Sequence, residues 1–334
     1  MGGLKGLTSM HVSKITAEAF NASIEKALNN IPDAECSIKK IQKTLNSLPN
    51  GKVFTSIRDG NAYFYTVVDG KQRYISKKSN LLYSLLRRRY LTCLMNILQL
   101  SNSRTVKDQK RRRAMICNVQ KLIQICETGN LDIARIVLTN HQYKWFTGYF
   151  KQKPIAPNTP FKSAGGLPLR SKSERDIANA NETFAVPFHY EEQLVIFVKP
   201  IVVGLLEELR NEGKLRGKLF TYTNGTIHWI VPEELQWMNS HGSIWKTYDS
   251  QKGTITIYSD FKVMFADDTL FFWEHSGLMA SFLYRCNASE RTAVMKYTKT
   301  VDDGHLLETY ENDIDTPEKR DDIIERHILP YLWF

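Results

Sequence analysis

The sequence predicts a mixed α/β protein, of the α+β kind, with a mainly helical first half and a second half that alternates helices and strands. Three observations lead to this prediction. Through much of residues 12–139, apolar side chains recur at the spacing of an amphipathic helix. A segment at about 53–76 interrupts that spacing with three short runs of β-prone residues. Beyond residue 169, strand-type and helix-type segments follow each other in turn.

The first domain, residues 1–150, is expected to be a helical region that contains a small β-meander, and it is a candidate nucleic-acid-binding module. Residues 12–48 are predicted to be helical, with a break at Pro32-Asp33. The meander at about 53–76 is expected to turn at Asp59-Gly60 and Asp69-Gly70, because an Asp-Gly pair readily adopts positive φ. A strongly patterned helix at 78–100, a linker at about 101–115 that leads into another helix, and helices at 114–127 and 130–139 are expected to follow.

A proline-rich segment separates the two halves. Residues 151–168 hold four prolines and two glycines, so they are predicted to be the linker between domains. Residues 169–334 are expected to form the second domain. Its first helix begins with Ser171 and has Glu174 three positions later, which is the pattern of a capping box. The elements expected here are a helix at 171–184, a strand at 188–198, a helix at 201–213, hairpins at 217–231 and 254–274, a helix at 287–301 and a strand at 305–310.

Composition narrows the class of function. The formal net charge is +10, which favours contact with a polyanion such as nucleic acid or an anionic membrane surface. No apolar run approaches the ~20 residues that a membrane-spanning helix needs, so a cytoplasmic protein without a membrane partner is expected. The five cysteines are scattered, without a Cys-x-x-Cys pair, which makes a zinc knuckle improbable and indicates reduced thiols.

Two acidic residues stand out in the hairpin at 254–274. Asp260 interrupts an otherwise apolar strand, and Glu274 closes the next one after a turn at Asp267-Asp268. The turn makes the two carboxylates near neighbours across an antiparallel pair. Opposed carboxylates repel each other unless a cation with oxygen ligands neutralises them. The alternative is that each side chain points outward into water from an edge hairpin.

Several motifs stand in a fixed order along the second half: Arg170-Ser171-Lys172-Ser173-Glu174 followed by Ile177-Ala178, then Phe188-His189-Tyr190-Glu191, Ser259-Asp260-Phe261 and Trp273-Glu274-His275-Ser276-Gly277. This set resembles the PD-(D/E)XK-type nuclease superfamily, in particular a bacterial group with R-S-K-S-E and W-E-H-x-G motifs. Lys296, eight residues before Gly304, stands where that group carries a lysine on a helix. In the first half, residues 74–78 are similar to the group's Y-I-x-K-K module.

The resemblance implies a restriction-endonuclease-like αβββαβ core with a mixed sheet in the second domain. It also implies a metal-dependent nuclease that hydrolyses phosphodiester bonds, in DNA. Asp260 and Glu274 would bind Mg²⁺, with Mn²⁺ as a substitute, and the backbone carbonyl of His275 would be a further ligand. Lys296 would orient the attacking water or stabilise the developing charge. Glu174 would reach the metal through water or hold the lysine, or act only as a capping-box residue.

Three departures from the group's pattern affect this interpretation. Ser259 replaces the proline of P-D-F, which these nucleases can do without. Ser276 stands where the motif lysine would be, so Lys296 is the remaining candidate for that charge. Residues 200–252 are longer than the pattern requires and are interpreted as an insertion.

Basic residues supply candidates for nucleic-acid contact. Arg170, Lys172 and His275 lie next to the motif carboxylates in the sequence. Arg111, Arg112 and Arg113 follow Lys110 in a compact basic run, and residues 87–89 form another. Phosphate contacts through such residues are independent of sequence and sensitive to salt. The alternative for both runs is a solvated helix face, and for the aromatic residues of 220–245 it is core packing.

Three hypotheses therefore remain open from the sequence. The first is a Mg²⁺-dependent endonuclease that binds DNA. The second is a nucleic-acid-binding protein that keeps the nuclease scaffold but has lost turnover, since the strand lysine is missing. The third is a basic helical module that binds a protein partner or a membrane. The sequence leaves the form of the substrate and the assembly, including a homodimer, undecided.

Overall fold

The computed structural model describes residues 14–148, 160–197, 218–221, 226–230, 247–249, 254–277, 288, 291–292, 295–296 and 303–333. Within them the protein is a mixture of helices and sheets, and it has a mixed sheet near its C-terminus. The predicted helix at 201–213 and the first half of the predicted linker, residues 151–159, lie outside these residues. Among the described helices, none is both long and apolar enough to cross a membrane.

The first half contains the predicted helices, with corrected boundaries: α1 (Ala17–Asn29), α2 (Ala34–Ser47), α3 (Asn80–Gln99), α4 (Val106–Thr128) and α5 (Ala134–Val137). It also contains α6 (Asn140–Thr147), which was not predicted. The break at Pro32-Asp33 is confirmed, and Asp33 caps α2 by accepting a hydrogen bond from the Cys36 amide. The prediction that a linker extends to about residue 115 is wrong. Thr105 caps α4 by accepting from the Asp108 amide, so the basic run at 110–113 is helical.

The predicted meander is confirmed as three antiparallel strands, β1 (Val53–Arg58), β2 (Asn61–Val68) and β3 (Lys71–Tyr74). Its two turns place Asp59 and Asp69 at φ of 48° and 52°, each followed by a glycine that also has positive φ. One face of the meander packs against the helices, because Ala62 and Phe64 of β2 are fully buried and β2 contacts α4.

The second half supplies the remaining elements: β4 (Phe161–Lys162), β5 (Pro168–Leu169), α7 (Lys172–Thr183), β6 (His189–Tyr190), β7 (Gln193–Phe197), β8 (Lys218–Thr221), β9 (Thr226–Ile230), β10 (Thr247–Asp249), β11 (Thr254–Tyr258), β12 (Phe261–Met264), β13 (Leu270–Ser276), a 3-10 turn (Asp303–His305), β14 (Leu306–Tyr310), α11 (Glu311–Ile314), α12 (Pro317–His327) and α13 (Leu329–Leu332). The capping box at the start of α7 is confirmed, as are the two hairpins, β8–β9 and β12–β13. The five described residues at 288, 291–292 and 295–296 are helical, within the predicted helix.

Two sheets meet end to end. The four-stranded sheet has the order β14-β13-β12-β6, in which β13 and β14 are parallel and the other pairs antiparallel. The five-stranded sheet has the order β7-β11-β10-β9-β8, so the predicted insertion contributes three of its strands. The predicted strand at 188–198 is therefore divided between the sheets, because its ladder is interrupted at Glu191 and Glu192.

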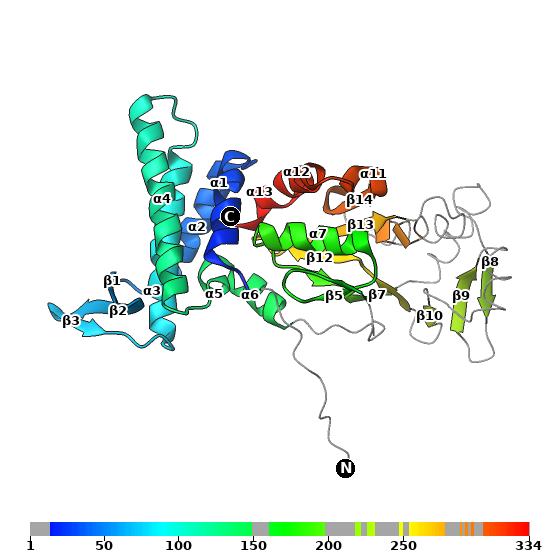
Figure 1. Ribbon diagram of the computed structural model, residues 1–334, viewed down its shortest axis with the longest axis horizontal. Coiled ribbons are helices and arrows are strands. Elements are labelled where there is room, and N and C mark those ends of the chain that lie inside the picture. Colours follow the sequence, from blue (N-terminus) through cyan, green and yellow to red (C-terminus); the bar gives the residue numbers. More distant parts are fainter. Residues whose placement is uncertain are drawn as a thin grey trace, which may run out of the picture.

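The halves of the chain pack against each other although they are far apart in sequence. Figure 1 shows the meander with α3 and α4 at one end, and α1 beside the C-terminal α13. Phe20 of α1 packs edge-to-face on Trp333, with ring centroids 5.1 Å apart. The buried amide of Gln142, in α6, donates hydrogen bonds to the carbonyls of Met264 and Leu332 at 2.9 and 3.0 Å. A helix from the first half thus satisfies backbone groups at the end of β12 and of α13.

Candidate active site

Asp260 and Glu274 face each other across the β12–β13 hairpin. The register pairs Phe261 with Trp273, which places Asp260 and Glu274 at the next opposed positions. The Asp260 amide donates to Glu274 Oε1 at 3.2 Å, and the His275 amide donates to Asp260 Oδ2 at 2.8 Å. The two carboxylates are therefore near neighbours, as the hairpin pattern predicts, although Asp260 precedes β12 instead of lying inside a strand.

The position of Asp260 follows from the interruption between the two sheets. Opposite it, Glu191 has a φ of 51°, an unusual value for a residue other than glycine. The Glu191 amide donates to the Asp260 carbonyl at 3.2 Å, and the Ser259 amide donates to the Glu192 carbonyl at 3.4 Å. Irregular pairing of this kind reorients side chains at a strand end. Here it brings the Asp260 carboxylate beside Glu274.

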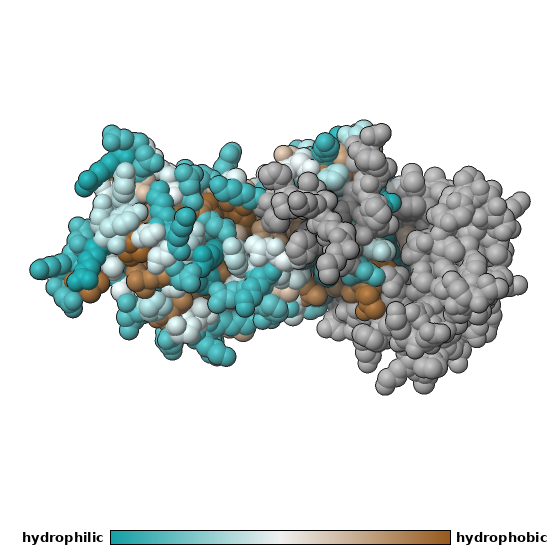
Figure 2. All heavy atoms as spheres, turned by 90° about the horizontal axis from the view of Figure 1, so that it is seen from below, coloured by the Kyte–Doolittle hydropathy of each residue, from teal (hydrophilic) through white to brown (hydrophobic). Residues whose placement is uncertain are grey.

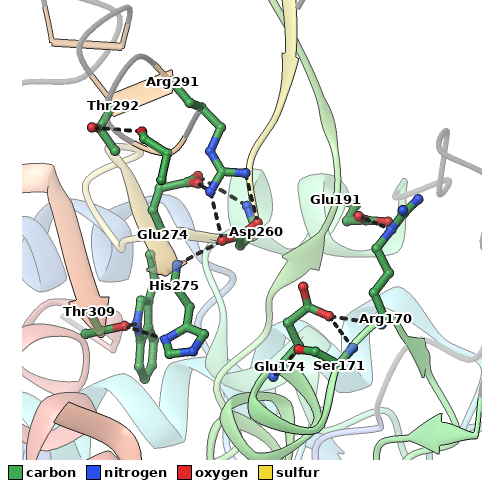
Figure 3. A network of polar contacts seen from close by, with 12 residues as sticks. Arg170, Ser171, Glu174, Glu191, Asp260, Glu274, His275, Arg291, Thr292 and Thr309 are labelled. Atoms are coloured by element: carbon green, nitrogen blue, oxygen red, sulfur yellow. Dashed lines mark hydrogen bonds and ion pairs between the residues drawn. The ribbon is translucent and has the colours of Figure 1, made fainter. Parts of the chain in front are cut away.

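Arg291 bridges the two carboxylates. Its Nη1 and Nη2 atoms donate to Asp260 Oδ1 and Oδ2, both at 3.2 Å, and Nη2 is also 2.7 Å from Glu274 Oε2. Since one nitrogen contacts both groups, Asp260 Oδ2 and Glu274 Oε2 are no further apart than the sum of those two distances. Figure 3 shows Arg291 reaching both side chains from the side opposite Glu174. The cation that lies between the two carboxylates is thus a guanidinium group, and the divalent metal ion expected from the sequence stays a prediction.

The environment of this pair is poorly solvated. The Glu274 side chain is 1% exposed, that of Asp260 12% and that of Arg291 16%. Burial raises the pKa of Glu274 to about 8; Arg291 opposes this rise, and the charge of Asp260 adds to it. A cation close to both carboxylates therefore favours the ionised form of Glu274.

Glu174 lies on the other side of Asp260, at the start of α7 (Figure 3). Its Oε2 atom accepts hydrogen bonds from the Ser171 amide at 2.8 Å, the Arg170 amide at 2.9 Å and the Tyr190 hydroxyl at 2.9 Å. Burial, and next the charge of Asp260, raise the pKa of Glu174. The capping role and proximity to Asp260 therefore coexist in this residue.

Arg170 and Lys172 flank the same helix start and are exposed. Arg170 Nε is 2.5 Å from Oε1 of Glu191, whose side chain is only 6% exposed. The guanidinium thus extends from solvent to the interruption between the sheets, next to Asp260.

Lys296 forms an ion pair with Glu308, at 2.5 Å between Nζ and Oε1. Glu308 lies on β14, in register with Glu274 of the parallel strand β13, and its charge is one of the causes that raise the pKa of Glu274. Within the part of the chain that the structure describes, the lysine reaches the site through Glu308, whereas Arg291 contacts the two predicted metal ligands directly.

His275 belongs to a neighbouring buried network. Its Nδ1 atom is 3.2 Å from Thr309 Oγ1, and that hydroxyl also accepts from Trp273 Nε1 at 2.8 Å. Its Nε2 atom is 3.4 Å from Oε2 of Glu311, which accepts a hydrogen bond from Ser173 at 2.9 Å. Burial lowers the pKa of His275, against the pull of Asp260 and Glu311. The network links R-S-K-S-E to W-E-H-x-G through Glu311.

The basic run on α4 is divided in its contacts. Arg111 and Arg113 are exposed, while Arg112 donates to the Leu28 carbonyl at 2.8 Å and to Asn29 Oδ1 at 3.2 Å. Arg112 therefore caps the C-terminus of α1. Of the run at 87–89, Arg87 is buried against carbonyls of Ile136 and Leu138, and only Arg89 is exposed.

Arg291, Glu308 and Glu311 were not identified from the sequence. The helix predicted at 287–301 contained Arg291, but its rotation about its axis depends on tertiary packing. Glu311 follows directly after β14, and only the fold brings it beside Ser173.

The donor set of the pair suits a hard divalent cation. Mg²⁺ is commonly held by one or two carboxylates together with waters and a substrate phosphate. Oε2 of Glu274 is buried and accepts no hydrogen bond within the described structure, although Arg291 lies beside it. No cluster of three or more His, Cys, Asp or Glu side chains with metal-binding geometry occurs among the described residues. Two carboxylates and the substrate would thus have to supply the ligands.

Comparison with known proteins gave no match: no protein-family model, curated protein or solved structure is significantly similar to this chain.

Proposed function

We propose that this protein is a metal-dependent nuclease that hydrolyses phosphodiester bonds in DNA. The observation that carries the proposal is the convergence of Asp260 and Glu274, from opposed positions of one hairpin, on a single cationic position. The arrangement of α7, β6, β12, β13, the helical residues at 288–296 and β14 supports a restriction-endonuclease-like αβββαβ core. In such a core the parallel pair β13–β14 requires the intervening crossover helix.

In this mechanism Asp260 and Glu274 would hold Mg²⁺ or Mn²⁺. When bound, the metal would polarise the scissile phosphate and lower the pKa of the attacking water. Arg291 would move from the carboxylates toward the phosphate and stabilise charge on its oxygens, for which a planar guanidinium is well suited. Lys296, held by Glu308, would add positive charge on the same side. Glu174 and Tyr190 would fix the start of α7, where Arg170 and Lys172 can meet the substrate backbone.

A second candidate is a nuclease-fold protein that binds nucleic acid without turnover. The specific observation in its favour is that Arg291 already neutralises the two carboxylates, while Ser276 stands in the position of the motif lysine. A basic helical module for a protein partner is the third candidate. It rests on the exposed arginines of α4 alone.

Cleavage of plasmid, single-stranded circular DNA and RNA by the purified chain tests these alternatives. The first candidate predicts cleavage with Mg²⁺ or Mn²⁺, none in EDTA, and loss of cleavage but not of binding in Asp260→Asn and Glu274→Gln. Asp268→Asn is the matched control, because it makes the same chemical change at an exposed turn of the same hairpin. Salt-sensitive binding without cleavage by the wild-type chain would favour the second candidate. Absence of nucleic-acid binding would leave only the third.

A further inference from the structure

The outer face of the meander carries a row of three aromatic rings. Phe54 of β1 is in register with Tyr65 of β2, and Tyr65 is in register with Tyr74 of β3. Paired residues of an antiparallel sheet project to the same face, so the three rings lie side by side across the strands. Tyr65 and Tyr74 are in edge-to-face contact, with centroids 5.9 Å apart.

This row is accessible, in contrast to the centre of the other face of the same strands. Phe54 is 42% exposed and Tyr74 is 56% exposed, whereas Phe64 of the inner face is fully buried. The meander projects beside α3 and α4 at one end of the molecule (Figure 1). Figure 2 shows apolar residues at this end among hydrophilic side chains. Large exposed rings in a row are unusual on a solvated sheet and are typical of a binding surface.

Positive charge surrounds the rings. Residues 52–78 contain six Lys or Arg residues and two Asp residues, and both Asp residues lie in the turns. Lys52 and Arg58 have the same strand parity as Phe54 and therefore flank the aromatic face. The positive charge around the rings thus favours a polyanion over a neutral or basic partner.

A groove continues from the aromatic row toward α3. It has a volume of about 660 Å³ and lies between β1 and α3, with Leu85 among its apolar residues and Lys52, Arg88 and Arg89 among its basic ones. Phe54 also lines this groove, so it belongs to both surfaces. Arg88 is engaged with the carbonyls of Leu45 and Leu48, which leaves Lys52 and Arg89 as the better-placed cations.

We propose that this surface, named here the aromatic face (Phe54, Tyr65, Tyr74 and the adjoining groove), binds single-stranded nucleic acid. Bases would stack on the three rings, and phosphates would follow Lys52 and Arg89. Stacking needs bases whose flat faces are open, which duplex bases do not offer, and aromatic rings beside cations are the general means of holding single strands. The inference deepens the proposed nuclease function, since it names the form of substrate that the first half would hold for the site.

Fluorescence anisotropy with labelled oligothymidylate and oligouridylate, in EDTA and with the full chain, tests the proposal. Phe54→Ala and Tyr74→Ala are each expected to weaken binding by about 5-fold or more, while Tyr74→Phe retains it, because stacking requires the ring and not the hydroxyl. Ile57→Ala is the matched control: Ile57 is 56% exposed on the opposite face of β1. Lys52→Gln should reduce the salt dependence of binding by about 0.7 in the log–log slope.

Equal binding of single strands by wild-type protein and both alanine variants would overturn the proposal and leave a protein partner as the occupant of the aromatic face. Tighter binding of a duplex, unaffected by these variants, would also overturn it. The two oligomers differ in the sugar and in the methyl group of thymine, and preference for either one supports the proposal. Circular dichroism and thermal unfolding confirm that the variants are folded. Because EDTA prevents cleavage, this result is independent of the nuclease assay: Asp260→Asn would abolish cleavage and leave this binding intact.

Discussion

Replacement of Arg291 by methionine tests whether the candidate site depends on a cation between buried carboxylates. The side chain keeps most of its length and loses its charge, so packing changes little. Asp260 and Glu274 are 12% and 1% exposed, and removal of their shared partner would leave negative charge without compensation in a poorly solvated place. Breaking a buried ion pair on one side costs about 3–5 kcal/mol of unfolding free energy.

The cost should depend on pH. Without Arg291 the pKa of Glu274, already raised to about 8 by burial, rises further. At pH 6 Glu274 then holds a proton and the loss of stability is small. Toward pH 9 Glu274 loses its proton, and its repulsion with Asp260 lowers the stability further. Urea denaturation in EDTA at both pH values measures the difference. Under the proposed function, Mn²⁺ in place of EDTA should restore part of the lost stability, because a metal ion bound only by the native carboxylates stabilises the folded state.

Lys296→Met is the control for this experiment. It also removes a cation from the same helical segment, but its ion pair with Glu308 is 43% and 31% exposed on the two sides. Exposed pairs contribute about 0–1 kcal/mol. If Arg291→Met costs no more than Lys296→Met at pH 9, or if Mn²⁺ has no effect on either, the carboxylate pair is not a cation site.

Three further predictions concern the rest of the molecule. Glu274→Gln should flatten the pH dependence of stability in EDTA. In the wild type the native state retains a proton on Glu274 that the unfolded chain releases, so the stability falls as pH rises from about 4.5 to about 8. Urea denaturation across that range measures this fall. Arg112→Ala should lower the unfolding free energy by about 1–3 kcal/mol, because the C-terminus of α1 loses a charged donor. The control Arg111→Ala should change the unfolding free energy by less than about 0.5 kcal/mol. Equal effects of the two substitutions would contradict the capping role. Gln142→Leu should lower the unfolding free energy by about 2 kcal/mol or more, because two buried carbonyls lose their donor. Thermal unfolding measures this loss. An unchanged melting temperature would show that α6 does not connect the halves in this way.

Local sequence patterns predicted many of the helices and strands. Helical spacing, Asp-Gly turns and the Ser171–Glu174 capping box depend on residues a few positions apart, and these elements are found where they were predicted. The error at the start of α4 is also local in origin. The predicted linker contains Lys and Arg, which are good helix formers, and Thr105 supplies the N-cap from which α4 begins.

The Asp260–Glu274 proximity was predictable because a single turn and the period of a strand determine which residues oppose each other. The partner of that pair was not. Arg291 lies on a different element, and its contact depends on how a helix rotates and packs against β13. The Glu308–Lys296 pair and the Glu311 contacts depend in the same way on the parallel β13–β14 register, which no local pattern encodes.

The sequence by itself determined many of the elements, the two opposed carboxylates and the positive charge of the chain, since each follows from short-range spacing or composition. The helices α6, α11, α12 and α13 were not predicted. Tertiary structure alone decided which charges meet. In the folded chain Arg112 caps the end of α1, and Arg87 is buried in the core. Arg291 lies between Asp260 and Glu274. Arg111, Arg113 and the aromatic face remain accessible. The physical reason is that burial and ion pairing depend on contacts between residues distant in the chain, and these contacts exist only once the sheets and helices have packed.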